Sequence, residues 1–271
     1  MKRLIDSHCH IYPEKISRKA VTAVDQFYDG LPAGKQHDGT PESLILAGKA
    51  EGITHFVVQS VATRPEQVGS INLFIADSVR KAGGLFTGLG AMHPDSETIE
   101  EDLEQLLGLG LKGVKLHPDI QKFKADDPKA FRIYELCEEK SLPVLIHTGD
   151  YRYDYSNPDR IIPILRTFPR LRVIGAHFGG WSVWEEAVQK LPEYPNLIVD
   201  TSSSFFWLKK ERALAIIRAY GARRCMFGTD YPMWGPKTDI DYLASLELTE
   251  EEREWICYRT CEELYGLGDG S

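Results

Sequence analysis

The chain has 271 residues, 42% of them hydrophobic and 27% charged, with 40 acidic against 32 basic side chains and a formal net charge of −8. This composition is typical of a globular protein with a substantial core. It argues against nucleic acid as a partner, because no patch rich in lysine, arginine and aromatic residues occurs. It also argues against a membrane protein, because no apolar run is long enough for a transmembrane helix.

The cysteines and the beginning of the chain indicate a cytoplasmic protein. Residues 1–3 lead directly into a predicted strand, without the apolar segment and cleavage site of a secretory signal. The cysteines are odd in number and form no CxxC pair; they are Cys9, Cys137, Cys225, Cys257 and Cys261. We expect buried free thiols in a reducing compartment.

Short β-branched runs alternate with amphipathic segments of helix length along most of the chain. The predicted strands are 3–9, 53–60, 85–91, 112–117, 143–148, 171–177, 196–200 and 223–228. The predicted helices lie near 65–82, 95–109, 127–141, 158–168, 181–190 and 208–220. Strict alternation predicts parallel strands with crossover helices, and eight such units favour a closed barrel over an open sheet. We therefore predict an α/β fold, a single (β/α)8 TIM-barrel domain spanning 1–271.

Two segments add to this repeat. Residues 12–42 form an insertion after the first strand, with a predicted helix over 14–28 followed by turn-forming residues over 29–39. An insertion there would sit over the barrel mouth as a lid, or else decorate the surface. Near the other end, Thr249 and Glu252 form a predicted capping box that opens a last helix. We expect this helix to stop at Gly266 and the residues after it to fray.

The first strand ends in His-x-His, the pair His8 and His10. Alternate side chains of a strand point to the same side, so the two imidazoles can converge. Two imidazoles at the end of a strand suit a divalent metal, zinc above all. The pair alone is weak evidence, because many such pairs are surface accidents.

The other histidines strengthen this interpretation. Of the eight, all except His37 and His55 fall at or just past the carboxyl end of a predicted strand. That end is the functional face of a (β/α)8 barrel, so six histidines would surround one mouth: His8, His10, His93, His117, His147 and His177.

Several motifs occur in a specific order along the strands. After His-x-His come Lys-Leu-His-Pro at 115–118, Leu-Ile-His-Thr-Gly-Asp at 145–150, Gly-Ala-His-Phe-Gly-Gly at 175–180 and Phe-Gly-Thr-Asp-Tyr-Pro at 227–232. This set resembles the amidohydrolase superfamily, and within it the branch that includes aminocarboxymuconate-semialdehyde decarboxylase. The resemblance spans nearly the whole chain.

The resemblance implies roles for particular residues. His8, His10, His147 and Asp230 match the family's metal ligands, and His177 matches the histidine that faces metal-bound water and substrate. It implies one divalent metal, zinc first and manganese as the alternative. Three imidazoles and a carboxylate would leave one position for water, and Asp230 and His177 would move protons. Homodimers are common in this branch, so a homodimer is possible here too.

The residues that contact a small-molecule substrate are less defined by the sequence. Lys115 and His117 share one face of a predicted strand; Lys115 would bind a carboxylate or, if carbamylated, bridge two metals. Arg64 and Arg152 follow strands and are suited to bind carboxylate. Aromatic residues that follow strands and would line a pocket, or pack loops on the rim, are Trp181, Trp207 and Trp234.

Two reactions fit these residues. Our first expectation is hydrolysis of an amide, ester or lactone of a small carboxylated or cyclic compound by metal-activated water. The alternative is non-oxidative decarboxylation of an aromatic or muconate-like acid at the same site. A non-catalytic barrel and a metal-dependent DNase are further alternatives; the intact ligand set argues against the first, and the acidic chain against the second.

Overall fold

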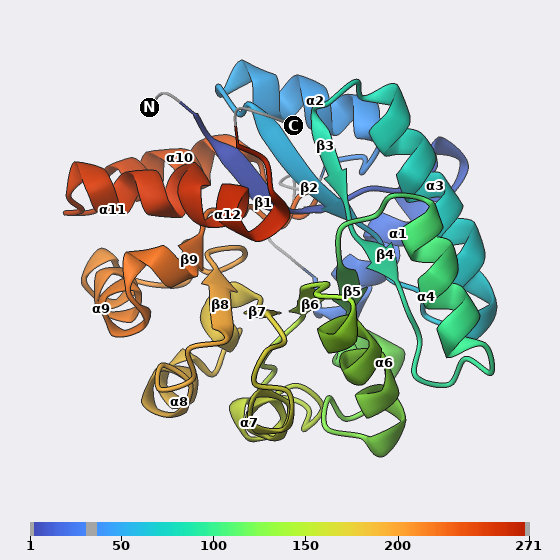
Figure 1. Cartoon of the computed structure of the whole chain (residues 1–271). Coiled ribbons are helices and arrows are strands. Elements are labelled where there is room, and N and C mark those ends of the chain that lie inside the picture. The colour runs from blue at the N-terminus through green and yellow to red at the C-terminus, as the bar shows by residue number, and fades with distance from the viewer. Residues whose placement is uncertain (1–2, 31–36, 269–271) are drawn as a thin grey trace.

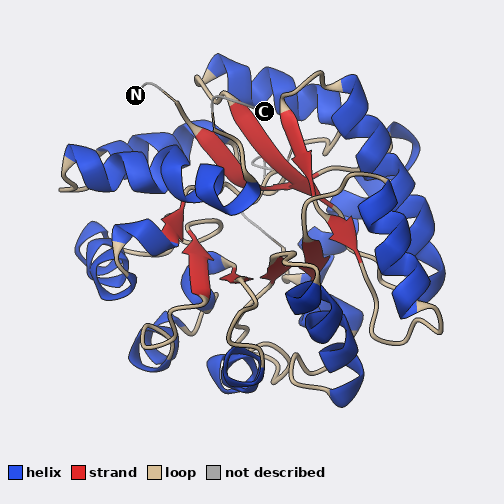
Figure 2. Cartoon of the chain, in the orientation of Figure 1, coloured by secondary structure: helices blue, strands red, loops and turns tan. Residues whose placement is uncertain are grey.

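The computed structural model describes residues 3–30 and 37–268 and confirms the predicted barrel. Its strands surround a central axis and its helices lie outside them (Figures 1 and 2). The strand pairings in the described part of the chain are parallel. The strands are β1 (Ile5–His10), β2 (His55–Gln59), β3 (Phe86–Gly88), β4 (Gly90–Ala91), β5 (Val114–Leu116), β6 (Val144–Ile146), β7 (Val173–Gly175), β8 (Leu197–Asp200) and β9 (Cys225–Met226).

Helices connect these strands and continue past the last one. The α-helices are α1 (Glu14–Phe27), α2 (Pro41–Ala50), α3 (Val68–Lys81), α4 (Ile99–Gly108), α5 (Pro118–Gln121), α6 (Pro128–Glu139), α7 (Pro158–Thr167), α8 (Trp184–Lys190), α9 (Lys210–Tyr220), α10 (Pro236–Ala244), α11 (Glu250–Glu254) and α12 (Thr260–Tyr265). Short 3₁₀ segments are η1 (Pro65–Gln67), η2 (His177–Gly179) and η3 (Ala222–Arg224), and η4 (Trp255–Arg259) is a π-helix. None of the described helices has the length and apolar character needed to cross a bilayer.

The predicted strand 85–91 divides into β3 and β4 at Leu89. The Leu89 N–H donates to the Val58 carbonyl at 2.9 Å, and the next residue, Gly90, donates to the Gly113 carbonyl at 2.9 Å. The chain therefore passes from the sheet β1-β2-β3 to the sheet β4-β5-β6-β7-β8-β9 while staying in the wall of the barrel.

Backbone hydrogen bonds close the barrel where its first and last strands meet. Ser7 N–H donates to the Phe227 carbonyl at 2.9 Å, and His10 N–H donates to the Tyr231 carbonyl at 2.7 Å. This seam places the segment after β9 beside the end of β1. The two motifs of the sequence that lie farthest apart therefore become neighbours.

An apolar layer fills the barrel below the site. Each member comes from a strand or from the β3–β4 junction: Ile5, Val57, Leu89, Leu145, Ile174, Ile198 and Met226. Cys261 and Tyr265 of α12 pack against this layer. His147 lies two residues after Leu145, and Asp200 lies two residues after Ile198. Both side chains therefore point to the same side as this layer, and the polar layer begins directly above the apolar one.

A bulge in β1 decides which of its side chains face inward. Asp6 pairs with Phe56 and Cys9 pairs with Val58, so β1 carries one residue more than β2 over this stretch. An extra residue reverses the alternation of faces. Ile5 can therefore lie in the interior layer and His8, three residues on, can still reach the site.

Several predicted boundaries and contacts are confirmed and others are wrong. The capping box of α11 is present, with Glu252 N–H donating to Thr249 Oγ1 at 3.2 Å, and the five cysteines are buried free thiols. Helix α4 begins at Ile99 rather than at 95, and α8 begins at Trp184 rather than at 181. Helices α2 and α10 were not predicted. The expected fraying of the last residues, 269–271, falls outside the described part of the chain.

Candidate functional site

A cavity of about 640 Å³ lies at the carboxyl ends of the strands. Its polar lining residues are Tyr12, Lys19, Tyr28, Ser60, Thr63, Gln67, Ser70, Lys115, Ser203, Asp230 and the histidines at 8, 10, 117, 147 and 177. Helix α1 contributes much of the remaining wall. Helix α1 of the insertion therefore lies at the barrel mouth, which agrees with the first of the two alternatives considered for this segment.

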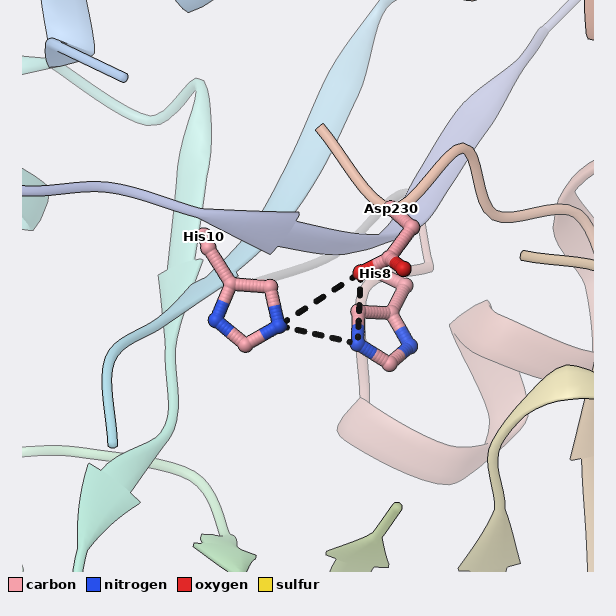
Figure 3. A group of neighbouring side chains, drawn as sticks. All are labelled: His8, His10 and Asp230. Atoms are coloured by element: carbon pink, nitrogen blue, oxygen red, sulfur yellow. Dashed lines mark hydrogen bonds and ion pairs between the residues drawn. The ribbon is translucent and has the colours of Figure 1, made fainter. Parts of the chain in front are cut away.

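His8, His10 and Asp230 converge at one point of this cavity (Figure 3). The Nε2 atoms of the two histidines lie 3.2 Å apart, and each lies 3.5 Å from Asp230 Oδ1. A tetrahedral zinc ion with ligands at its usual bond lengths holds neighbouring donor atoms about 3.3–3.4 Å apart. The chemistry and the spacing of these three donors fit a divalent metal.

A hydrogen bond orients the His8 ring so that it can bind a metal. Its Nδ1 lies 2.9 Å from Asp200 Oδ2, a buried carboxylate at the end of β8. An Nδ1–H that donates to this carboxylate leaves Nε2 without a proton and directed into the cavity. Burial lowers the pKa of His10 and of His147, with further lowering by nearby cationic groups, so both favour the neutral form that binds metal.

We expect Asp200→Asn to weaken metal binding about 10- to 100-fold, because the carboxylate that fixes the His8 ring is lost. Asp200 also accepts hydrogen bonds from the backbone N–H groups of His177, at 3.1 Å, and Ser202, at 3.0 Å. Competition between the protein and a chelator for zinc measures the change. The exposed Asp241→Asn on α10 is the matched control. Equal zinc affinity in both variants would contradict the role given to Asp200.

Asp230 is a charged acceptor at the base of the cavity. Burial opposes its ionisation, but His8, His177 and His10 together bring its pKa down to about 2. Its other oxygen, Oδ2, accepts a hydrogen bond from Ser203 Oγ at 2.5 Å, and Ser203 Oγ accepts from Trp234 Nε1 at 2.8 Å. The carboxylate is therefore ionised and held in place.

Lys115 brings a buried cation to the floor of the cavity. Its side chain is 1% exposed, and Nζ lies 3.1 Å from His8 Nε2. Burial lowers its pKa to about 8, although Asp230 and Asp200 favour the charged form. An ammonium group in this place can bind a carboxylate that enters the cavity.

His147 and His177 stand beside each other, next to the three converging donors. His177 Nε2 lies 2.9 Å from His147 Nδ1, and His177 Nδ1 lies 2.9 Å from the Ser202 carbonyl oxygen. The His177 ring stacks on that of His8, with centroids 5.4 Å apart. His147 groups instead with His117 and Asp119, where donor atoms of all three lie within 4.8 Å of one another. Its role as a metal ligand stays a prediction.

Tyr28 links helix α1 to these histidines. Its hydroxyl lies 3.1 Å from His117 Nε2 and 3.4 Å from His147 Nε2. The two imidazoles are stacked, with centroids 3.9 Å apart and planes inclined by 6°. His117 Nδ1 accepts the Ile120 N–H at 3.3 Å, which leaves Nε2–H to face the tyrosine. The end of α1 is thus hydrogen-bonded to the floor of the site.

The amidohydrolase family model matches residues 5–267, almost the whole chain. The chain belongs to the amidohydrolase family. A curated relative of this amidohydrolase is 2-amino-3-carboxymuconate-6-semialdehyde decarboxylase of Dictyostelium discoideum, 25% identical over 235 residues. The match covers 73% of this chain and 66% of the relative, so it spans slightly less than two thirds of that protein.

Solved structures share the fold of this amidohydrolase. An uncharacterised TIM-barrel protein from Bordetella bronchiseptica superposes with a TM-score of 0.81 at 23% identity, covering 98% of this chain and 99% of the other. A dihydroxybenzoic acid decarboxylase from Polaromonas, solved with manganese, gives 0.74 at 16% identity, covering 100% and 98%. A protein described as a 2-pyrone-4,6-dicarboxylic acid hydrolase from Pseudomonas putida gives 0.69 at 18%, covering 99% of each chain. The family match makes this protein an enzyme of the amidohydrolase family, and the solved structures show that it shares their fold.

The two arginines predicted to bind substrate lie outside the cavity lining of the amidohydrolase. Arg64 is exposed at the start of η1. Arg152 is paired with Asp150, at 2.7 Å from Nη2 to Oδ2, and its Nη1 donates to the Phe27 carbonyl at 2.7 Å. Its guanidinium also lies 5.1 Å from the ring centre of Tyr28. Arg152 therefore ties the end of α1 to the loop after β6.

Of the three predicted tryptophans, two line the cavity and one lies outside it. Trp181 and Trp234 line the cavity, whereas Trp207 is 48% exposed and packs edge-on against Phe206. His93 is buried away from the lining and accepts the Asp95 N–H at 3.1 Å. His117 and Lys115 both face the cavity, as their spacing along the strand predicted.

Sequence reasoning missed several polar groups of the site, among them Asp200, Ser203 and Tyr28. Asp200 ends a predicted strand, the same signal that located the histidines, but it belongs to no motif. Ser203 lies three residues after the end of β8. Tyr28 lies at the end of a predicted helix far from any strand, so nothing in its local sequence pointed to the site.

Proposed function

We propose that this amidohydrolase is a metal-dependent carboxy-lyase that releases CO₂ from a small aromatic or unsaturated carboxylic acid. From the sequence we expected hydrolysis, with decarboxylation as the alternative, and the names of the relatives support the alternative. The curated relative carries a decarboxylase name, and so does the manganese-containing neighbour. These names support the class of reaction and not a particular substrate.

The observation that carries the proposal is the buried ammonium group beside the metal-ligand cluster. Lys115 Nζ lies 3.1 Å from His8 Nε2 at the floor of the cavity. A carboxylic acid that enters would place its carboxylate against this cation and the oxygen or carbon atoms next to it against His8, His10 and Asp230. Attraction between opposite charges is strong where water is excluded.

Decarboxylation requires loss of CO₂ and protonation of the substrate carbon. The bond between the substrate carbon and the carboxyl carbon breaks, CO₂ leaves, and the bonding electron pair remains on the substrate carbon, which takes up a proton. Asp230 and His177 line the cavity, and because both are unprotonated near pH 7, either would first take this proton from a water molecule and then pass it to the substrate carbon. A bound divalent metal would supply Lewis-acid polarisation of a substrate oxygen.

The residues proposed to hold the metal are His8, His10, His147 and Asp230. We infer zinc, because nitrogen-rich ligand sets suit it. Manganese is the alternative, supported by the manganese in the dihydroxybenzoic acid decarboxylase neighbour. Hydrolysis of a lactone or similar bond is the second candidate reaction, supported by the neighbour described as a pyrone dicarboxylic acid hydrolase.

The test begins with protein purified without chelator or added metal, whose metal content is measured by elemental analysis. The protein is then incubated in D₂O with a panel of hydroxybenzoic and muconate-like acids, and CO₂ release is recorded. We expect about one zinc or manganese ion per chain, CO₂ from at least one acid, and deuterium at the carbon that lost the carboxyl group.

Three other results would support a different reaction or contradict the proposal. Hydrolysis of lactones or amides in parallel assays without CO₂ release would make the enzyme a hydrolase. Two metal ions per chain would favour a carbamylated Lys115 that bridges them. Protein that takes up no metal when zinc and manganese are offered would contradict the proposal as a whole.

A further inference from the structure

The cavity is polar at its floor and apolar along the wall that α1 forms. The side chains of α1 on this wall are Ile16, Ala20, Ala23, Val24 and Phe27. Their spacing of three, four and seven residues places them on one face of the helix. Helix α1 therefore turns an apolar face toward the site.

Among the described residues, nothing fully covers the part of this apolar face formed by Ile16 and Ala23. Ile16 is 51% exposed, and Ala23 is exposed while it lines the cavity. Ile71 and Phe74 of α3 also line the cavity and add to its apolar wall. Uncovered apolar groups around a cavity with polar groups at one end are typical of a ligand site.

Size and charge narrow the ligand that fits. A volume of about 640 Å³ lies in the middle of the range found for pockets that enclose drug-sized molecules, so it has room for several carbon atoms beyond a single ring. Among the described residues that line the cavity, the basic side chains other than histidine are Lys115 on the floor and the exposed Lys19 on α1. The buried end of the cavity therefore offers one cation to an acid.

We infer that the ligands of this site are monocarboxylic acids that carry an apolar extension, with the carboxylate at Lys115 and the extension against α1. This inference rests on the proposed function, because that function places the carboxylate of the acid against Lys115. It adds a substrate class that the reaction alone does not define. Helix α1 then acts in specificity as well as in covering the site.

Binding measurements test this without turnover. Zinc-loaded protein is titrated by calorimetry with benzoate, 4-butylbenzoate and the uncharged 4-butylbenzamide. We expect 4-butylbenzoate to bind about 10- to 100-fold more tightly than benzoate, because each added methylene group in an apolar pocket increases affinity. We expect the amide to bind at least about 10-fold more weakly than the matching acid, because it lacks the charge that Lys115 attracts.

A pair of variants locates the effect on α1. Ala23→Phe fills the apolar end of the cavity and should reduce the preference for 4-butylbenzoate over benzoate to about twofold or less. Thr22→Phe places the same ring on a neighbouring exposed position outside the cavity lining and should leave the preference unchanged. Both sites are exposed, so each variant is expected to fold.

The outcomes separate this inference from the proposed reaction. Equal affinity for the two acids would overturn the inference, even if CO₂ release is observed with other acids. Loss of the preference in Thr22→Phe as well as Ala23→Phe would overturn the role of the α1 wall. Tighter binding of 4-butylbenzoate in wild type that is lost only in Ala23→Phe would support the inference, even if no acid loses CO₂.

Discussion

Asp230→Asn is expected to lose its bound metal and at least about 1000-fold of its activity. Asp230 Oδ1 lies 3.5 Å from the Nε2 atoms of both His8 and His10 and is the single carboxylate in that cluster. An amide keeps the shape of the side chain but removes its negative charge, which strengthens the binding of a divalent cation. Elemental analysis of the purified variant, followed by activity assays with added zinc, measures both losses.

Two comparisons make this result specific. Asp241→Asn changes an exposed carboxylate that pairs with Lys237 on α10 and should keep the metal content and activity of the wild type. His147→Ala should also lose metal if His147 is a ligand. If Asp230→Asn retains one metal ion per chain at wild-type affinity, the assignment of Asp230 is wrong.

The second large effect is expected from His177→Asn, which should keep its metal and lose about 10²- to 10⁴-fold in kcat. His177 lines the cavity but does not belong to the cluster of His8, His10 and Asp230. Burial lowers its pKa to about 4, against the opposing effect of Asp230, so the imidazole is neutral near pH 7 and able to accept a proton. Asparagine keeps a polar group there but cannot transfer protons at neutral pH.

The control is a histidine at the other end of the barrel. His55 begins β2, and its Nε2 lies 2.9 Å from Thr87 Oγ1. His55→Asn should leave both kcat and metal content as in the wild type, and thermal melting of the variants checks that they fold. If His177→Asn strips the metal while Asp230→Asn keeps it, the two roles must be exchanged.

Much of the site could be predicted from the sequence because a parallel barrel orders its strand ends. Once the alternation of strands and helices is recognised, each residue at the carboxyl end of a strand belongs to one mouth. His8, His10, His117, His147 and His177 were placed there on this ground, and the cavity lining includes all five. His93 has the same position in sequence, but its ring serves the loop after β4 instead.

Side chains that come from loops and inserted helices could not be placed in this way. Arg152 has the chemistry of a carboxylate ligand, yet its partners are Asp150 and the last turn of α1. Tyr28 has no distinctive pattern around it, yet its hydroxyl reaches His117. Which partner such a residue meets depends on how the insertion folds back over the barrel, which local periodicity does not encode.

The alternation of strands and helices, the carboxyl-end position of the histidines and the buried cysteines could be predicted because they follow from local periodicity and composition. That Ile5 and His8 both face inward could not be predicted in this way and depends on the folded chain. Their separation of three residues would place them on opposite faces of a regular strand. The bulge between Asp6 and Cys9 corrects this, and it arises from pairing with a strand nearly fifty residues away. Long-range pairing of this kind also brings Asp200 to His8 and Asp230 to His10, and so forms the site.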